Sequence, residues 1–297
     1  MKLRPFRLAL AVAALPFPLL AQQPPAPPGS VPAAAPVAPP TISYADAADL
    51  VIASPLVIDA TIRSTARIKG AEAADVAPGA TRLYVQADVN ALVRGPGAIP
   101  PRIGYLLDAA PDADGRAPKY RKSRVIMFAR PVAGRGDQVQ LVTPAAQLGW
   151  TPANDALARR IVAELLARDA PPVITGVGNA FHVAGSLPGE GETQVFLRTA
   201  DQRPVSLSIL RRPGEQPRWA VALSEIIDDA AAPPPAETLL WYRLACALPP
   251  ALPDRSIESL APDDAAIARE DYRFVIARLG ACGRAARPPV SGGGAPG

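Results

Sequence analysis

The stretch from Thr81 to Arg94, TRLYVQADVNALVR, carries the clearest pattern in the chain. Apolar residues alternate along it with polar or amphipathic ones: Leu83, Val85, Ala87, Val89, Ala91 and Val93 against Arg82, Tyr84, Gln86, Asp88, Asn90 and Arg94. Only Leu92 interrupts the second set. Because successive side chains of a strand point to opposite faces, the pattern predicts a long β-strand with one face in a core and the other largely in water.

The preceding segment, Leu56 to Ile68, alternates in the same way, and Pro78-Gly79 supplies a turn signal between the two. Two such strands predict a half-buried antiparallel sheet. Both segments exceed the usual strand length of about five or six residues. We therefore expect them to coil or bulge, as strands do when a sheet closes into a barrel.

Three more strands are predicted at Arg102 to Asp108, Ser123 to Arg130 and Gln138 to Val142. The middle one contains Val125-Ile126-Met127-Phe128-Ala129, which is apolar on both faces and therefore belongs in the middle of the packing. In order and length the five strands resemble a small antiparallel barrel of the oligonucleotide- and oligosaccharide-binding (OB) type. A β-sandwich or an SH3-like barrel also fits these lengths.

The second half of the chain changes pattern at Thr151-Pro152, which can cap and begin a helix that runs to Arg168. Turn signals then separate four predicted strands at 180–183, 193–198, 205–210 and 219–224. Two helices follow, one around Leu239 to Cys246 and one at Pro262 to Leu279. The sequence thus predicts a β-rich α+β chain: an OB-like barrel domain at 41–148, then a helix, an antiparallel meander and two C-terminal helices at 149–283.

The first 21 residues have the layout of a secretory signal peptide: a cationic start, an apolar run from Leu8 to Leu20, and Leu19-Leu20-Ala21 before Gln22. The run contains two prolines and is too short to span a bilayer. A Pro/Ala tract at 22–40 predicts a disordered spacer, and the Gly/Pro-rich residues 284–297 predict a disordered tail. We expect a periplasmic or secreted protein that does not span the membrane once its leader is removed.

Charge argues against nucleic acid as a partner. The formal net charge is +4, but Lys2, Arg4 and Arg7 belong to the leader, which leaves 28 cationic against 27 acidic residues. A near-neutral mature chain has no general attraction to polyanions.

Cys246 and Cys282 are the two cysteines of the chain, and in an oxidising compartment we expect them to form a disulfide. Such a bridge could contribute about 3–4 kcal/mol. Two cysteines and one histidine do not make a typical structural zinc site, and no motif implies a metal or another cofactor.

His182 is the single histidine and a candidate general base, with Ser186, Glu190 and Glu192 close behind it in sequence. The competing interpretation, a histidine on a strand's solvent face or satisfied in the core, is the one we favour, because no nucleophile-elbow motif accompanies Ser186. Gly176-Val177-Gly178 lacks the third glycine and helix start of a dinucleotide loop, which favours a flexible entry into the next strand.

The densest basic cluster is Lys119, Tyr120, Arg121, Lys122 and Arg124. OB barrels can bind sugars or oligonucleotides through charged, aromatic surfaces, which makes this cluster a candidate binding segment. The competing interpretation is a solvated loop, since basic clusters alone rarely specify a partner.

The leading functional hypothesis is a non-enzymatic exported bacterial protein that serves in envelope interaction or assembly, with an envelope protein or a glycan as its partner. One alternative is a periplasmic hydrolase that uses His182 with Ser186 or a nearby acid. Another is a glycan- or anion-binding protein that works through Lys119 to Arg124.

Overall fold

The alternating stretch forms a single strand, β2 (Thr81–Arg94), in the computed structural model, which describes residues 41–112, 114–223 and 231–285. Leu83, Val85 and Ala87 are buried, as the alternation predicts. β2 pairs antiparallel with β1 (Leu56–Arg67), and three register shifts interrupt this ladder. These shifts let two long strands coil instead of forming a flat ribbon.

The first sheet closes into a barrel because β1 also pairs with β4 (Arg124–Val132). Around the barrel the order is β1-β2-β3-β5-β4, with β3 at Arg102–Ala109 and β5 at Arg135–Leu141. This closed barrel is consistent with the predicted OB-like arrangement. A short strand, β6 (Gln147–Gly149), adds to β4.

One ladder of the barrel differs from the prediction of an antiparallel barrel. β3 and β5 run parallel, so the barrel is mixed. The reason is topological: five strands in a closed ring cannot alternate direction at every contact, because five is odd. One neighbouring pair must be parallel, and here the pair is β3 and β5.

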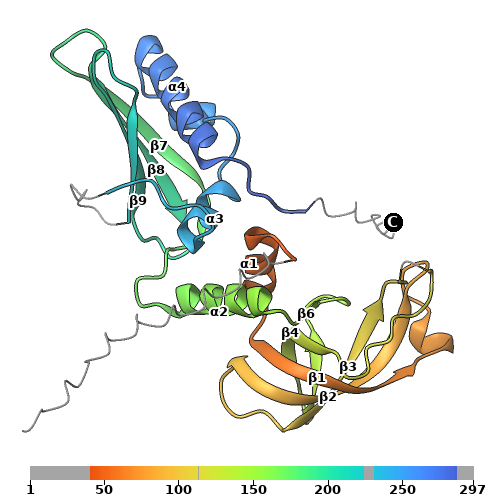
Figure 1. Cartoon of the computed structure of the whole chain (residues 1–297). Helices are drawn as coiled ribbons and strands as arrows, with labels where there is room; N and C mark the ends of the chain where they lie inside the picture. Colours follow the sequence, from red (N-terminus) through yellow and green to blue (C-terminus); the bar gives the residue numbers. More distant parts are fainter. Residues whose placement is uncertain (1–40, 113, 224–230, 286–297) are drawn as a thin grey trace, which may run out of the picture. The chain divides into compact units, whose positions relative to one another are not determined.

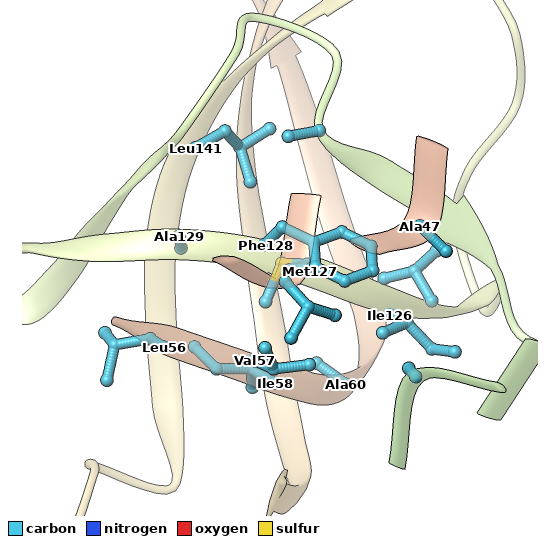
Figure 2. Close-up of a cluster of buried hydrophobic side chains, with 14 of the residues drawn as sticks. Ala47, Leu56, Val57, Ile58, Ala60, Ile126, Met127, Phe128, Ala129 and Leu141 are labelled. Carbon is cyan, nitrogen blue, oxygen red and sulfur yellow. The ribbon is translucent and has the colours of Figure 1, made fainter. Parts of the chain in front are cut away.

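The barrel core centres on β4, where Val125 to Ala129 are all buried, as the doubly apolar pattern predicts. Figure 2 shows Phe128 and Met127 beside Val57 and Ile58 of β1, with Ala47 near the same cluster. Ala47 belongs to α1 (Tyr44–Ala53), whose first turn is capped by Ser43. α2 (Pro152–Leu166) begins as predicted, with Thr151 accepting a hydrogen bond from the Asn154 backbone N–H and Pro152 in the first turn.

The second sheet is an antiparallel meander in the order β10-β9-β8-β7. Its strands are β7 (Ile174–Ala184), β8 (Gly191–Thr199), β9 (Val205–Arg211) and β10 (Arg218–Ala222). Figure 1 shows α4 (Pro262–Leu279) running along one face of this sheet. Val195, Leu207 and Ile209 are fully buried in the cluster that α4 joins through Tyr272 and Val275.

β7 starts earlier than the sequence indicates, at Ile174 instead of residue 180. Gly176 and Gly178, read from the sequence as a flexible entry, lie inside the strand, and a bulge interrupts its ladder between Val177 and Ala180. Glycine in a strand often marks a bulge or a close approach, and both occur here.

Cys246 and Cys282 form the predicted disulfide. Cys246 caps the C-terminus of α3 (Leu239–Ala245), and Cys282 follows the end of α4, so the bond joins these two helices. Two single turns of 3-10 helix, η1 (Gly70–Ala73) and η2 (Asp254–Ser256), complete the secondary structure of the described residues. The predicted leader and spacer, and residues 286–297 of the predicted tail, lie outside the described residues.

Candidate functional site

The parallel seam between β3 and β5 leaves a hollow on the barrel surface. The two strands share one bridge, Gly104 with Gln138, and the next link joins the Asp108 N–H to the Pro144 carbonyl at 2.9 Å. Between these links the β3 side spans four residue steps and the β5 side spans six. Because the longer side must bow away from the shorter one, the seam opens into a hollow of about 510 Å³, which we call the seam pocket.

Tyr84 forms one wall of the seam pocket and is held there by a glycine. A Cβ atom on Gly104 would lie 2.3 Å from the Tyr84 hydroxyl oxygen and 2.9 Å from Cζ, so the ring rests directly on the β3 backbone. Leu106, half exposed, continues this apolar wall. An aromatic ring fixed on a strand can stack against a flat ligand without first losing rotamer freedom.

The opposite wall is polar and comes from β4, β5 and the segment after β5. It is lined by Gln138, Gln140, Thr143 and Arg130. The Arg130 guanidinium donates a hydrogen bond to the Gln140 side chain at 3.2 Å. Amides and hydroxyls both donate and accept hydrogen bonds. This wall therefore suits a ligand rich in hydroxyl or amide groups.

Charge in the seam pocket is largely compensated. Arg82 donates two hydrogen bonds of 2.8 Å to the Asp108 carboxylate and one of 2.7 Å to Asp75. The bonds to Asp108, and secondarily to Asp75, raise the pKa of the Arg82 guanidinium above its ordinary value. The hydrogen bond from Arg82 in turn lowers the pKa of Asp75. The two acids, Arg82 and Arg130 together give the lining no net charge.

Tyr105 lies at the floor of the seam pocket, only 2% exposed, and donates a hydrogen bond to the Gln147 side chain. Burial raises the pKa of its phenol, so the hydroxyl stays protonated. Its role in the barrel is to join β3 to β6 across the floor.

The predicted binding segment Lys119 to Arg124 is brought together as the turn before β4, but its members differ in role. Arg124 donates to Asp59 at 2.6 and 2.9 Å and lies 3.8 Å from the centre of the Trp150 ring. Asp59 is 1% exposed, so Arg124 neutralises a buried carboxylate. Tyr120 packs against the barrel core, which leaves Lys119, Arg121 and Lys122 as the exposed cations of this segment that form no ion pair with a described residue.

His182 faces the helix-covered side of the second sheet. Its Nδ1 lies 2.9 Å from the Thr193 hydroxyl, and that hydroxyl donates to Asp271 of α4 at 2.5 Å. Asp271, fully buried, also accepts a 2.6 Å hydrogen bond from Arg211. The histidine therefore belongs to a chain of buried polar groups that ties α4 to β8 and β9.

The structure does not bring His182 together with the acids and serine that follow it. The Glu190 carboxylate accepts from the backbone N–H groups of Ser186 and Leu187, closing the β7–β8 turn. Glu192 accepts from the side chains of Gln194 and Ser208, on the opposite face of the sheet from Asp271. No hydrogen bond in the described ranges joins His182 to Ser186, Glu190 or Glu192. The hydrolase assignment stays a prediction.

Sequence reasoning missed the seam pocket and the partners of His182. One signal was available for the pocket: Gly104 interrupts a strand whose neighbours are all larger, and glycine there can mark a close approach. No local signal relates His182 to Asp271, since the two are 89 residues apart in the chain.

In residues 41–112, 114–223 and 231–285, no group of three or more His, Cys, Asp and Glu side chains is placed to hold a metal ion. In the same residues, no helix has the length and apolarity to cross a bilayer.

In comparisons with known proteins, the chain matches no protein-family model, and no curated protein is significantly similar to it.

Proposed function

We propose that this protein is an exported, non-enzymatic binding module that recruits an envelope protein or a glycan through the seam pocket of its barrel. The observation that carries the proposal is the open β3–β5 seam: a preformed hollow with a fixed aromatic wall, a polar wall and compensated charge. Such walls favour an uncharged, hydroxyl- or amide-rich surface over a polyanion.

Export rests on two observations of different kinds. The sequence of the first 21 residues has the layout of a cleavable leader. The Cys246–Cys282 disulfide is of the kind that persists in oxidising compartments and is rare in the cytosol. Cell fractionation and N-terminal sequencing of the purified protein test this part: we expect a periplasmic or secreted protein that starts near Gln22.

Site-specific photocrosslinking in living cells tests the pocket. Leu106 is 50% exposed and lines the seam pocket, whereas Leu166 is 63% exposed and lies on α2. A photoreactive phenylalanine analogue at position 106 should give discrete adducts to envelope protein or glycan, and the same analogue at position 166 should not. Tyr84→Ala should remove the adducts at position 106.

The same experiment can overturn the proposal. Indistinguishable adducts at positions 106 and 166, or adducts at 106 that persist unchanged in the Tyr84→Ala variant, would exclude the seam pocket as the binding site. The absence of any adduct at position 106 in cells that express the protein from its own promoter would do the same.

The two alternatives keep their own tests. If the protein is a hydrolase, His182→Ala should abolish turnover of ester or glycoside substrates while the fold is retained. If the basic turn binds anions or glycans, reversing the charges of Lys119, Arg121 and Lys122 should abolish a salt-sensitive binding that Tyr84→Ala leaves intact.

A further inference from the structure

In the part of the chain that the structure describes, one face of the second sheet keeps several large side chains exposed, although Ser206 and Ala222 on the same face are buried. α4 packs on the inner face, against which His182, Val195 and Leu207 are buried. On the outer face large apolar side chains remain in solvent: Phe181 is 46% exposed, Val183 68% and Phe196 40%. Phe181 and Phe196 meet edge to face with ring centres 5.8 Å apart. Contiguous apolar surface of this kind on a sheet usually marks an interaction site.

Charges on this outer face are separated along β8. Its outward residues run Glu192, Gln194, Phe196, Arg198, from an acid at one end to a base at the other. Over six residues the two charges are about 20 Å apart. Within the described residues Arg198 forms no ion pair, and the carboxylates of Glu190 and Glu192 accept only from uncharged donors. Among the described residues, neither Glu192 nor Arg198 therefore has an ion-pair partner, and Arg218, which lies level with Glu192 on β10, pairs with Glu215.

Large and small side chains are also separated along the direction of β8. At the acidic end, Phe181, Val183 and Leu210 surround Glu192 and line a hollow of about 540 Å³. At the basic end the neighbouring strands carry small residues: Gly176 pairs with Arg198, and Ser206 pairs with Phe196. A Cβ on Gly176 would lie 2.7 Å from the Arg198 guanidinium, so the arginine rests across β7 on this face.

We infer that this outer face binds the same face of a second copy of the chain. Two sheets that pack face to face keep their strands nearly aligned, with an angle of about 30° from the twist. If a two-fold axis crosses β8 near Val195, each strand lies antiparallel over its own copy. Glu192 then faces Arg198 of the second copy, and the reverse pair forms at the other end.

The same two-fold rotation also places large side chains of one copy opposite small residues of the other. Phe181, level with Gln194 in the ladder, comes over the glycine-lined part of β7 near Gly178 in the second copy. Phe196 and Arg198 of each copy then lie opposite the acidic hollow of the other. An isologous dimer requires a surface that is complementary to itself after a two-fold rotation. Here that rotation places acid opposite base and large side chains opposite small ones.

The expected dimer is weak. Four strands about 4.8 Å apart and about 20 Å long present on the order of 400 Å² in projection, well below the roughly 800 Å² per partner of a stable interface. The association should therefore depend on concentration in the micromolar range and weaken with salt. It involves neither the seam pocket nor the barrel, so it stands apart from the proposed function.

Sedimentation velocity of the purified protein across about 1–500 µM tests the inference, since an interface of this size associates weakly. We expect a monomer–dimer equilibrium that Arg198→Glu or Glu192→Arg each weakens at least about tenfold, because like charges then face each other at both ends. The combined Arg198→Glu, Glu192→Arg variant should recover most of the affinity. Arg273→Glu makes the same charge change on the solvent side of α4 and should leave the equilibrium unchanged.

Three outcomes overturn the inference: a monomer at every concentration, single charge variants that dimerise like the wild-type protein, or a combined variant that stays as weak as the single ones. Far-ultraviolet circular dichroism confirms that each variant is folded. Because all four substituted forms change exposed or half-exposed side chains, we expect them to fold like the wild-type protein.

Discussion

The two sheets of this protein cover their hydrophobic faces by different means. The barrel closes on itself, so its strands pair on both edges, and its core includes side chains of α1 and α2 as well as those of the strands. The second sheet stays open, with α4 on one face and, among the described residues, exposed apolar side chains such as Phe181 and Val183 on the other. The comparison teaches that ring closure holds the barrel strands at both edges, whereas the second sheet depends on what fastens its helix. Four experiments, each with a substitution or a change of conditions, test this difference between the two sheets.

The largest expected effect is on the buried polar chain that fastens α4. Asp271→Ala leaves Arg211 without its buried carboxylate and removes the acceptor of the Thr193 hydroxyl. Removing one partner of a buried pair costs about 3–5 kcal/mol, and we expect the lower end because Arg211 is 23% exposed. Urea unfolding measures the loss. Asp254→Ala, which breaks the exposed pair with Arg269, should cost at most about 0.5 kcal/mol.

A loss below about 1 kcal/mol for Asp271→Ala would mean that α4 is held by its apolar contacts alone. The polar chain would then be incidental to the second sheet.

The disulfide gives the next effect. Reduction, or Cys246→Ser with Cys282→Ser, should destabilise the protein by about 3 kcal/mol, because the bond closes a loop of 36 residues. Amide hydrogen exchange should rise in α3, α4 and the second sheet while the barrel strands stay protected. Equal loss of protection in β1, β2 and β4 would contradict the contrast between the two sheets.

A smaller effect is expected in the barrel at Gly104. Gly104→Ala forces the Tyr84 ring off the β3 backbone and should cost about 1–2 kcal/mol, as overpacking does. In a Tyr84→Ala background the same change should be neutral or stabilise by about 0.5 kcal/mol, since alanine restricts the unfolded chain. A double-mutant cycle by chemical unfolding measures this coupling. Equal costs in both backgrounds would show that the glycine does not serve to seat the tyrosine.

The smallest effect concerns pH and Asp59. Burial would raise the pKa of this carboxyl, but hydrogen bonds from Arg124 and Asn90 outweigh burial, so the pKa lies below its ordinary value. As pH falls, the Asp59 carboxylate therefore binds a proton in the unfolded chain before it does so in the folded protein. The free energy of unfolding that this carboxylate contributes at neutral pH is lost as pH falls through its folded-state pKa. Between pH 7 and pH 3 the stability difference between wild type and Asp59→Asn should shrink by about 1 kcal/mol. A difference that is constant with pH would contradict this.

Local patterns were sufficient to predict the disulfide, the helices α2, α3 and α4 and most of the strands, but they missed β6 and the first six residues of β7. Alternation from Leu83 to Val93 predicted β2, and the doubly apolar run from Val125 predicted the central β4. Export context predicted the pairing of Cys246 with Cys282. Each of these depends on neighbours in sequence or on composition, which is what a single sequence records.

The candidate site could not be predicted because it depends on register between distant strands. The seam pocket exists because the segments Gly104 to Asp108 and Gln138 to Pro144, which run between the same two links, contain unequal numbers of residues. The partners of His182 depend on which residue of α4 faces β8, and no periodicity of β7 contains that information. Strand direction was the exception: an odd number of strands in a closed ring requires one parallel pair.

The most direct test of the proposed function is a map of amide chemical shifts. The isotope-labelled protein is titrated with soluble peptidoglycan fragments and, separately, with detergent-solubilised envelope proteins. Binding at the seam predicts shifts concentrated at Leu106, Gln138 and Gln140 and absent in the Tyr84→Ala variant. Shifts concentrated instead at Lys119 to Lys122 or at His182 to Glu192, with the seam residues unmoved, would contradict the account.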